Sequence, residues 1–192
     1  MENPDLLMIQ ETKVEEDSIL GLGKNNWNLN KGIAVSAREA SSGLTILWNE
    51  KSFELHDSFA TQHWIFTELT HQESRICFSL VNIYVPSIYK EKKECWNSMA
   101  DFLDILSPPN IILAGDLNII LKAEEKKGGF FGNDNIRNRV EEIIDHLDLL
   151  DIKPQIGRYT WTNRCTRNTH IAARLDRFLI QSKLLLQRKL VT

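Results

Sequence analysis

The sequence has only three cysteines, Cys77, Cys95 and Cys165, in 192 residues. Three scattered cysteines are too few for a structural zinc site, and an odd number argues against a disulfide framework. No apolar run approaches the roughly 20 residues that a membrane-spanning helix requires. The N-terminal MENPDLLMIQ has acidic residues where a signal peptide would have basic ones. We therefore expect an intracellular protein, neither secreted nor membrane-bound, whose thiols are free and buried or half-buried.

The sequence also lacks the glycine-rich fingerprint of dinucleotide-binding domains, the Gly-Lys-Ser/Thr of phosphate-binding loops, and any internal repeat. A chain of 192 residues can bury one substantial core and leaves little room for a second. We therefore expect a single domain over residues 1–192.

Charge is distributed unevenly along the chain. Residues 153–192 contain nine basic residues and one acidic residue, a net charge of +8, so residues 1–152 carry −11 of the total of −3. This division suggests a basic face for a polyanion beside an acidic region that could hold a metal ion. A solvated basic end with no partner is an equally simple explanation of the charge alone.

What the sequence does contain is a long series of short strand patterns and few helical ones. Apolar or alternating runs predict strands at 5–10, 32–36, 44–48, 53–59, 64–69, 75–85 and 110–114, and shorter ones near 159–161 and 175–180. Apolar residues at three- and four-residue spacing predict helices over 90–106 and about 140–150, and a short helix is expected near 14–20. A polar, glycine-rich loop is expected over about 124–134. Two packed sheets covered by outer helices explain this order better than a doubly wound parallel sheet.

Four polar clusters lie at or near the ends of these strands: Gln10-Glu11-Thr12, Asn82-Ile83-Tyr84-Val85-Pro86, Gly115-Asp116-Leu117-Asn118 and Arg174-Leu175-Asp176-Arg177-Phe178. A strand end that faces a cleft can present a carboxylate without burying it unpaired. Each cluster also has a simpler explanation. Glu11 could be an exposed strand-end acid, the Gly115-Asp116 pair a turn, and Tyr84 a core residue. Asp176 could merely balance the charge of its two arginine neighbours.

In this order, the clusters resemble the QET, NxYxP, GDxN and RLD motifs of the endonuclease/exonuclease/phosphatase superfamily. Smaller matches are Ser42-Gly43-Leu44 and Tyr159-Thr160-Trp161-Thr162-Asn163. The segments RYTWTN and ARLDRFLI are most similar to endonuclease domains that precede reverse transcriptases in plant LINE elements, a class of non-LTR retrotransposon. The resemblance covers nearly the whole chain. It implies an α/β (α+β) four-layer sandwich of the DNase I-like kind, in which two mostly antiparallel mixed sheets are flanked by helices.

The resemblance also assigns roles to single residues. Glu11 would be the carboxylate that binds Mg²⁺, or Mn²⁺ in its place, steadied by Gln10. Asp116 would orient or deprotonate the attacking water, and Asn118 would hold the phosphate or that water. Tyr84 would place its hydroxyl near the phosphate or the metal shell. Asp176 would accept a hydrogen bond from a downstream histidine and favour the charged ring.

DNA is the partner that the basic segment and the LINE-like motifs favour. The candidate phosphate contacts are Arg164, Arg167, Arg174 and Lys183, which would position a duplex without reading its sequence. Trp161 could pack beside a groove or a displaced base, although a tryptophan at such a strand position is more often part of the core, and we expect it there. A nucleic-acid partner is compatible with either the nucleus or the cytoplasm.

The resemblance further predicts that the chain lacks a first strand with a catalytic asparagine and a C-terminal strand with a Ser-Asp-His motif. None of the five histidines lies in a matching context. Removing a phosphate-stabilising group costs on the order of 10²–10⁴ in rate, so we expect impaired catalysis.

Three hypotheses follow. The first is a Mg²⁺-dependent DNA endonuclease domain that accompanies a reverse transcriptase domain in the full-length ancestor. The second is a catalytically dead retroelement remnant with at most weak nucleic-acid binding. The third is a lipid-phosphate phosphatase of the same fold, which the basic segment and the GDLN and RLDRF motifs disfavour.

Overall fold

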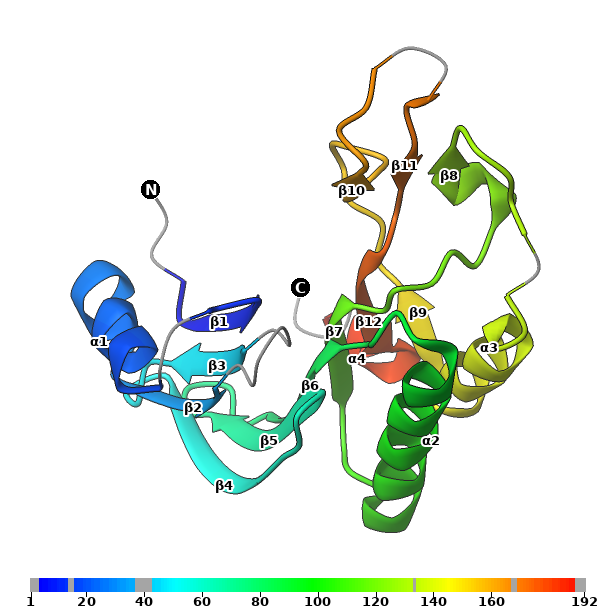
Figure 1. The fold of residues 1–192 in the computed structure, drawn as a ribbon. Helices are drawn as coiled ribbons and strands as arrows, with labels where there is room; N and C mark the ends of the chain where they lie inside the picture. The colour runs from blue at the N-terminus through cyan, green and yellow to red at the C-terminus, as the bar shows by residue number, and fades with distance from the viewer. Residues whose placement is uncertain (1–3, 14–15, 37–42, 133, 167–168, 189–192) are drawn as a thin grey trace.

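The computed structural model describes residues 4–13, 16–36, 43–132, 134–166 and 169–188. Its larger sheet has six strands in the order β4-β5-β6-β7-β12-β9 (Figure 1). These strands are β4 (Phe53–Ala60), β5 (Trp64–His71), β6 (Cys77–Tyr84), β7 (Ile111–Asp116), β9 (Leu149–Asp151) and β12 (Asp176–Gln181). Only β6 and β7 run parallel, and the other neighbours in this sheet are antiparallel.

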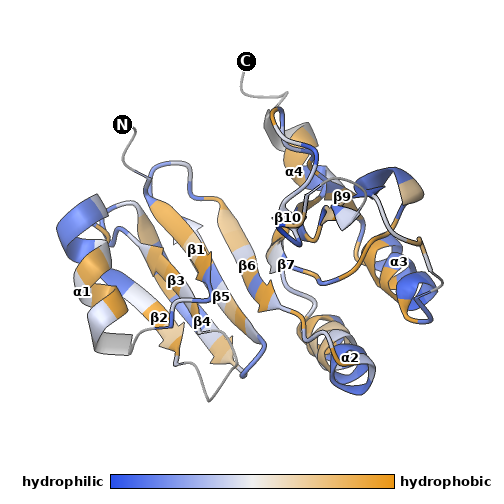
Figure 2. Ribbon diagram, turned by 45° about the horizontal axis from the view of Figure 1, so that its top comes forward, coloured by the Kyte–Doolittle hydropathy of each residue, from blue (hydrophilic) through white to orange (hydrophobic). Residues whose placement is uncertain are grey.

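A smaller antiparallel sheet packs against one face of the larger sheet, in the order β1-β3-β2. Its strands are β1 (Leu6–Gln10), β2 (Lys31–Val35) and β3 (Leu44–Trp48). Between the two sheets lies a core of buried side chains that includes Leu44 and Ile46 of β3 and Ile65 of β5. Figure 2 shows β1 and β3 as largely hydrophobic.

Helices form the two outer layers. Helix α1 (Glu16–Trp27) contacts the smaller sheet, while α2 (Tyr89–Leu106) and α3 (Arg137–His146) cover the far face of the larger one. The core under α2 and α3 includes Trp96 and Val140, which pack with strand residues such as Leu113. The four layers confirm the expected sandwich (Figures 1 and 2).

A third, small sheet extends from one end of this sandwich (Figure 1). It has the order β10-β11-β8, with β10 (Trp161–Thr162), β11 (Ala172–Ala173) and β8 (Lys126–Lys127). The 3-10 helix η1 (Ala123–Glu125) precedes β8, and α4 (Ser182–Arg188) follows β12. We call β10, β11 and their connection the arm.

Most expected elements are present, and the exceptions have local causes. The helix expected to reach residue 150 ends at His146, because a turn follows in which Asp148 has a φ of 52°. Leu150 therefore lies on β9 and is 42% exposed, not on the apolar side of α3. The loop expected over 124–134 contains part of η1 and all of β8.

Two further expectations concern cysteines and membranes. Cys95 is buried and Cys77 half-buried, as expected, but Cys165 is exposed because it lies in the connection of the arm. Within the described ranges, no helix combines the length and the apolar character that crossing a bilayer requires.

Candidate functional site

The strand-end motifs meet at one edge of the molecule. Because β6 and β7 are parallel, Tyr84 and Asp116 are paired at their carboxyl ends. Strand β12 runs antiparallel to β7, so its first residue, Asp176, is the partner of Asp116 on the other side. The Tyr84 hydroxyl donates a hydrogen bond of 3.2 Å to Oε1 of Glu11, the residue that follows β1. Tyr84 and Glu11 are therefore brought together by the two packed sheets.

A buried amide pair fastens the smaller sheet to the larger one beside this site. Asn82 is completely buried, and its Nδ2 donates to the carbonyl oxygens of Ile9 at 3.0 Å and Thr45 at 2.9 Å. Its Oδ1 accepts a hydrogen bond from Nε2 of Gln10. The amides of the QET and NxYxP motifs thus hold the end of β1 against β6, which fixes where Glu11 lies.

Glycine is required at position 115 because the strands approach closely there. Gly115 has a φ of +143°, and a Cβ atom built on it would lie 1.8 Å from the carbonyl oxygen of Ile83. That approach lets Asp116 lie next to the end of β6, where its carbonyl accepts a hydrogen bond of 2.8 Å from the backbone of Val85. The glycine of the GDxN motif therefore serves to place the carboxylate.

Asp116 is held in an environment that favours its neutral form. Burial raises the pKa of the carboxyl to about 6, and the negative charges of Asp176 and Glu11 act in the same direction. The backbone N–H of Asn118, which donates to Oδ1 at 2.7 Å, and the charge of Lys92 lower the pKa and only partly offset the rise. Asp116 can therefore take up or release a proton near neutral pH, as a general base must.

Asn118 is oriented by contacts that include one from outside the four motifs. Its φ is +47°, and its side-chain Nδ2 donates to the Val85 carbonyl at 3.2 Å. Lys92 of α2 is only 7% exposed, and its ammonium donates to the Asn118 carbonyl at 2.9 Å and to Asp134 at 3.2 Å. The signal in the sequence is a lysine on the side of the helix where the other buried residues are apolar, a pattern not used in the predictions above.

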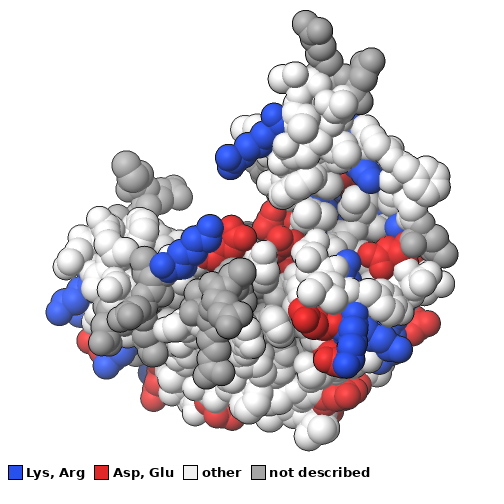
Figure 3. Space-filling model, in the orientation of Figure 1, with Lys and Arg blue, Asp and Glu red and all other residues white. Residues whose placement is uncertain are grey.

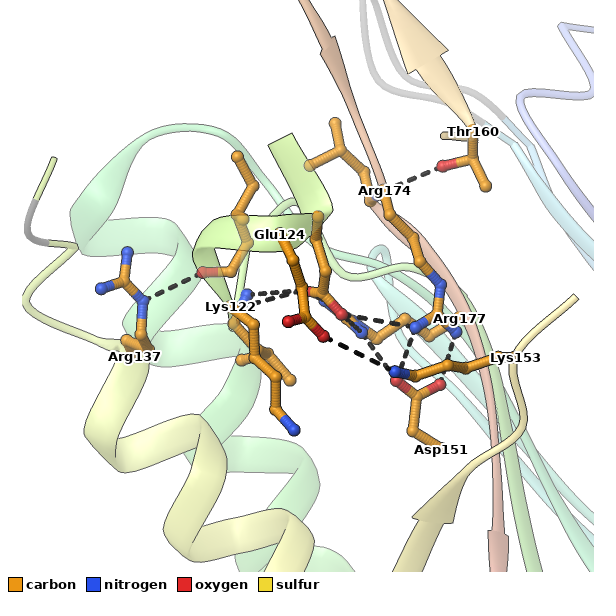
Figure 4. Close-up of polar contacts among 12 residues, drawn as sticks. Lys122, Glu124, Arg137, Asp151, Lys153, Thr160, Arg174 and Arg177 are labelled. Atoms are coloured by element: carbon orange, nitrogen blue, oxygen red, sulfur yellow. Dashed lines mark hydrogen bonds and ion pairs between the residues drawn. The ribbon is translucent and has the colours of Figure 1, made fainter. Parts of the chain in front are cut away.

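Asp176 does not neutralise its arginine neighbours. Arg174 and Arg177 are buried and form ion pairs with Glu125 and Asp151 (Figure 4). Asp176 is exposed, because side chains alternate between the two faces of a strand. The simpler explanation of Asp176 as a counter-charge is therefore wrong, because Glu125 and Asp151 already neutralise both arginines.

The histidines do not supply a partner for Asp176. All five lie in the described part of the chain, and none hydrogen-bonds to this carboxylate there. Four bond elsewhere: His56 to Thr70, His71 to Ser74, His146 to Asp104 and His170 to Thr162. His63 lines a small pocket against α2.

The four residues predicted to contact phosphates differ in where they lie. Arg164 is exposed in the connection of the arm, and Arg167 lies outside the described residues. Arg174 is a wrong prediction, because its guanidinium is buried and bound to Asp151 at 2.6 and 2.7 Å. Lys183 lines a pocket with Ile111 at the start of β7, the opposite end of that strand from Asp116. The prediction that Lys183 contacts a phosphate at this site is therefore also wrong.

Trp161 is likewise not in the core, and is 45% exposed on β10. The arm stands clear of the sandwich, so a tryptophan on its two-residue strand has no core beside it (Figure 1). Figure 3 shows acidic side chains at the bottom of a hollow beneath the arm, with basic side chains on either side. This arrangement suits a polyanion that approaches an acidic centre.

Residues 2–191 match the Endonuclease/Exonuclease/phosphatase family. The chain belongs to this family. A solved structure of the AP endonuclease LMAP from Leishmania major superposes on this family member with a TM-score of 0.66 at 20% identity, covering 95% of this chain and 71% of that one. The endonuclease domain of TRAS1, a telomere-specific non-LTR retrotransposon, superposes with a TM-score of 0.61 at 12% identity, covering 81% and 68%. These likenesses show a shared fold.

A sequence relative links the chain to mobile elements. The chain is 26% identical over 120 residues to the transposon TX1 uncharacterized 149 kDa protein of Xenopus laevis. The match covers 59% of this chain and 9% of that protein. This relative supports the expected retroelement context, while the likeness to plant elements and the two missing strands stay predictions.

Proposed function

We propose that this chain carries a Mg²⁺-dependent DNA endonuclease site of the retrotransposon type, with low turnover. The observation that supports it is the convergence of Glu11, Tyr84, Asp116, Asn118 and Asp176 from separate strand ends. A structural role would not require three carboxylates near one another, because each disfavours the ionisation of the others. A site that binds a cation through one carboxylate and activates a water with another explains why these acids converge.

The donor set fits magnesium. Within the described residues, no group of three or more Asp, Glu, His or Cys side chains could hold a metal ion. Magnesium usually keeps several waters and binds through one or two carboxylates, so an open oxygen site suits it better than zinc. Glu11 is exposed and lies at a fixed strand end, and we assign it as the carboxylate that would hold the ion. When bound, the ion would neutralise charge on the phosphate.

The chain's own residues would then divide the remaining work. Asp116, with its pKa raised to about 6, would accept a proton from the attacking water. Asn118 is fixed beside it and would orient the phosphate or the water. The Tyr84 hydroxyl, held by Glu11 at 3.2 Å, would contact the phosphate. Asp176 would lie ready for a cationic partner that the described residues do not provide, which is why we expect slow turnover.

DNA is the proposed substrate because of the basic side chains around the hollow and the retroelement relatives. These features favour the nuclease over a lipid-phosphate phosphatase of the same fold. A reverse transcriptase domain is the proposed neighbour in the full-length element, and Mn²⁺ is the alternative ion. The competing proposal is a remnant that binds DNA weakly and cleaves nothing, which the absence of a histidine beside Asp176 in the described residues favours.

Nicking of supercoiled plasmid tests the proposal. The chain should convert plasmid to open circles slowly in Mg²⁺ and not at all in EDTA. Asp116→Ala should reduce the rate by on the order of 10²-fold or more, as expected for loss of a general base. Asp57→Ala is the matched control, since Asp57 is an exposed acid on the edge strand β4.

Two outcomes would overturn the assignment. Nicking that persists in EDTA or in Asp116→Ala would mean that another nuclease or another site is responsible. No nicking by a folded chain that still binds DNA would establish the remnant instead.

A further inference from the structure

Lys92 is a charged residue on the buried side of helix α2, and its side chain is only 9% exposed. The other buried residues of this helix are apolar: Cys95, Trp96, Met99, Ala100 and Leu103. An ammonium removed from water destabilises a protein unless it is paired and hydrogen-bonded, whereas an apolar side chain would suit this helix face. The packing of α2 therefore does not explain why a lysine lies here.

The Lys92 ammonium reaches both the GDxN motif and the loop before α3. It donates to the Asn118 carbonyl oxygen at 2.9 Å and to Oδ2 of Asp134 at 3.2 Å. The other carboxylate oxygen of Asp134 accepts a hydrogen bond of 3.2 Å from the backbone N–H of Ile136, which fixes this acid next to the start of α3. Lys92 thus connects an acid outside the motifs to the backbone of the turn that follows Asp116.

The turn at Asn118 has a backbone conformation that residues other than glycine rarely adopt, with a φ of +47°. The Asn118 N–H donates to Oδ1 of Asp116 at 2.7 Å, and its carbonyl accepts from Lys92 at 2.9 Å. The two backbone groups of one residue therefore link the Asp116 carboxylate to the Lys92 ammonium. Loss of the ammonium would leave the carbonyl of this turn without that donor.

Lys92 also brings a positive charge to a site rich in acids. The titratable groups around Asp116 are Glu11 after β1, Tyr84 at the end of β6, Asp176 at the start of β12 and Lys92 of α2. Burial is the largest cause of the raised pKa of Asp116, and the two neighbouring acids raise this pKa further. The charge of Lys92 acts in the opposite direction.

We propose that Lys92 is a positioning residue of the nuclease site. Its ammonium fixes the Asn118 turn beside Asp116 and keeps a positive charge near that carboxylate, while Asp134 neutralises part of this charge. The inference rests on the proposed function, and it adds to that site a residue and its counter-ion from segments without a motif. Removal of the ammonium and removal of its counter-ion should change the acidity of Asp116 in opposite directions. A lysine that only supports the fold would not have this effect.

Three variants test this assignment. Lys92→Met removes the ammonium and leaves an apolar side chain, and Asp134→Asn removes the counter-charge but keeps an oxygen for the Ile136 N–H. Lys93→Met is the matched control, because Lys93 is an exposed lysine of the same helix. Carboxyl carbon NMR of the metal-free chain measures the pH midpoint of Asp116, whose signal is identified by its loss in Asp116→Asn. The midpoint near pH 6 should rise by roughly 0.5 in Lys92→Met, fall in Asp134→Asn and stay in Lys93→Met.

The rate of plasmid nicking in Mg²⁺ separates the two effects of Lys92. A higher midpoint lowers the fraction of Asp116 that can accept a proton, so Lys92→Met should lose most activity below about pH 7. A displaced Asn118 turn should also reduce kcat at about pH 8 by roughly 10-fold with little change in KM, because geometry and not binding is lost. Lys92→Arg keeps the positive charge and should restore the pH dependence.

The outcomes distinguish this inference from the function beneath it. Midpoints that do not move in Lys92→Met and Asp134→Asn, or that move in the same direction, would overturn the role of Lys92 and leave the nuclease proposal intact. If thermal unfolding shows that Lys92→Met does not fold, Asp134→Asn decides alone, because it keeps the ammonium. No nicking by any of the chains would overturn the nuclease proposal, and the midpoints would still show whether Lys92 acts on Asp116.

Discussion

Within the proposed site, folding shifts the pKa of the Asp116 carboxyl, which is raised to about 6. In the unfolded chain the pKa returns to about 3.9, so between about pH 4 and 6 the folded state binds more protons. Stability therefore falls as the pH rises through this window and then levels off. Asp116→Asn should abolish this pH-dependent change in stability. It should also raise the free energy of unfolding at pH 7 by about 1–2 kcal/mol, after allowance for solvent screening.

Urea unfolding of both chains at pH 4 and pH 7, in EDTA, measures this effect. The stabilisation by Asp116→Asn should be large at pH 7 and small at pH 4. An equal difference at both values would mean that the carboxyl is not perturbed by its burial and its acidic neighbours.

The pKa of Glu125 is shifted in the opposite direction to that of Asp116. Burial alone would raise its pKa, but hydrogen bonds and charge from Arg177 outweigh burial and lower the pKa to about 2. This stabilisation is fully present above about pH 4.5 and is lost as the pH falls toward 2. Glu125→Ala leaves the fully buried Arg177 side chain short of a counter-charge, so it should cost about 3–5 kcal/mol.

Denaturant unfolding at pH 7 checks this value, with Glu124→Ala as the neighbouring control. Glu124 is exposed and meets Lys153 at 3.8 Å, so its removal should change stability by less than about 0.5 kcal/mol. Similar effects for the two variants would argue against the buried network shown in Figure 4.

At the scale of elements, substitution of two glycines by alanine should change stability in opposite directions. Gly115→Ala should destabilise the chain by more than about 3 kcal/mol, because its Cβ would meet the backbone of Ile83 at 1.8 Å. Gly21→Ala should stabilise it by about 0.5–1 kcal/mol, because the exposed glycine lies within α1 and nothing lies within 4 Å of the added carbon. Thermal unfolding of the two variants measures both, and a stable Gly115→Ala chain would contradict the close approach of β6 and β7.

Element positions could be predicted from the sequence where periodicity was strong. The strand patterns and the helix over 90–106 depend on local alternation or spacing, and the structure confirms them with small shifts of boundary. The burial of Arg174 could not be predicted, because its partners Asp151 and Glu125 are 23 and 49 residues away in the chain. Trp161 was misplaced for a related reason, since nothing in its neighbourhood indicates an arm that leaves the sandwich.

At the scale of the whole molecule, the site exists because two sheets end at the same edge. Each motif contributes one strand end, and the parallel pair β6 and β7 aligns two of them directly. The order of the motifs could therefore predict the cluster of acidic residues. The residues that surround this cluster could be identified only from the packed structure. Lys92, whose ammonium donates to the Asn118 carbonyl, lies on a helix that carries no motif.

We propose that these strand ends form a site for a hydrated divalent cation. The dependence of thermal unfolding on Mg²⁺ tests this proposal without requiring turnover. At about ten times its dissociation constant, Mg²⁺ should stabilise the folded chain by about 1.4 kcal/mol, which raises Tm by roughly 3–5 °C. Glu11→Ala should abolish the shift, whereas Glu124→Ala should keep it. A Tm that does not respond to Mg²⁺, or a shift that survives Glu11→Ala, would mean that Glu11 at the end of β1 does not hold the ion.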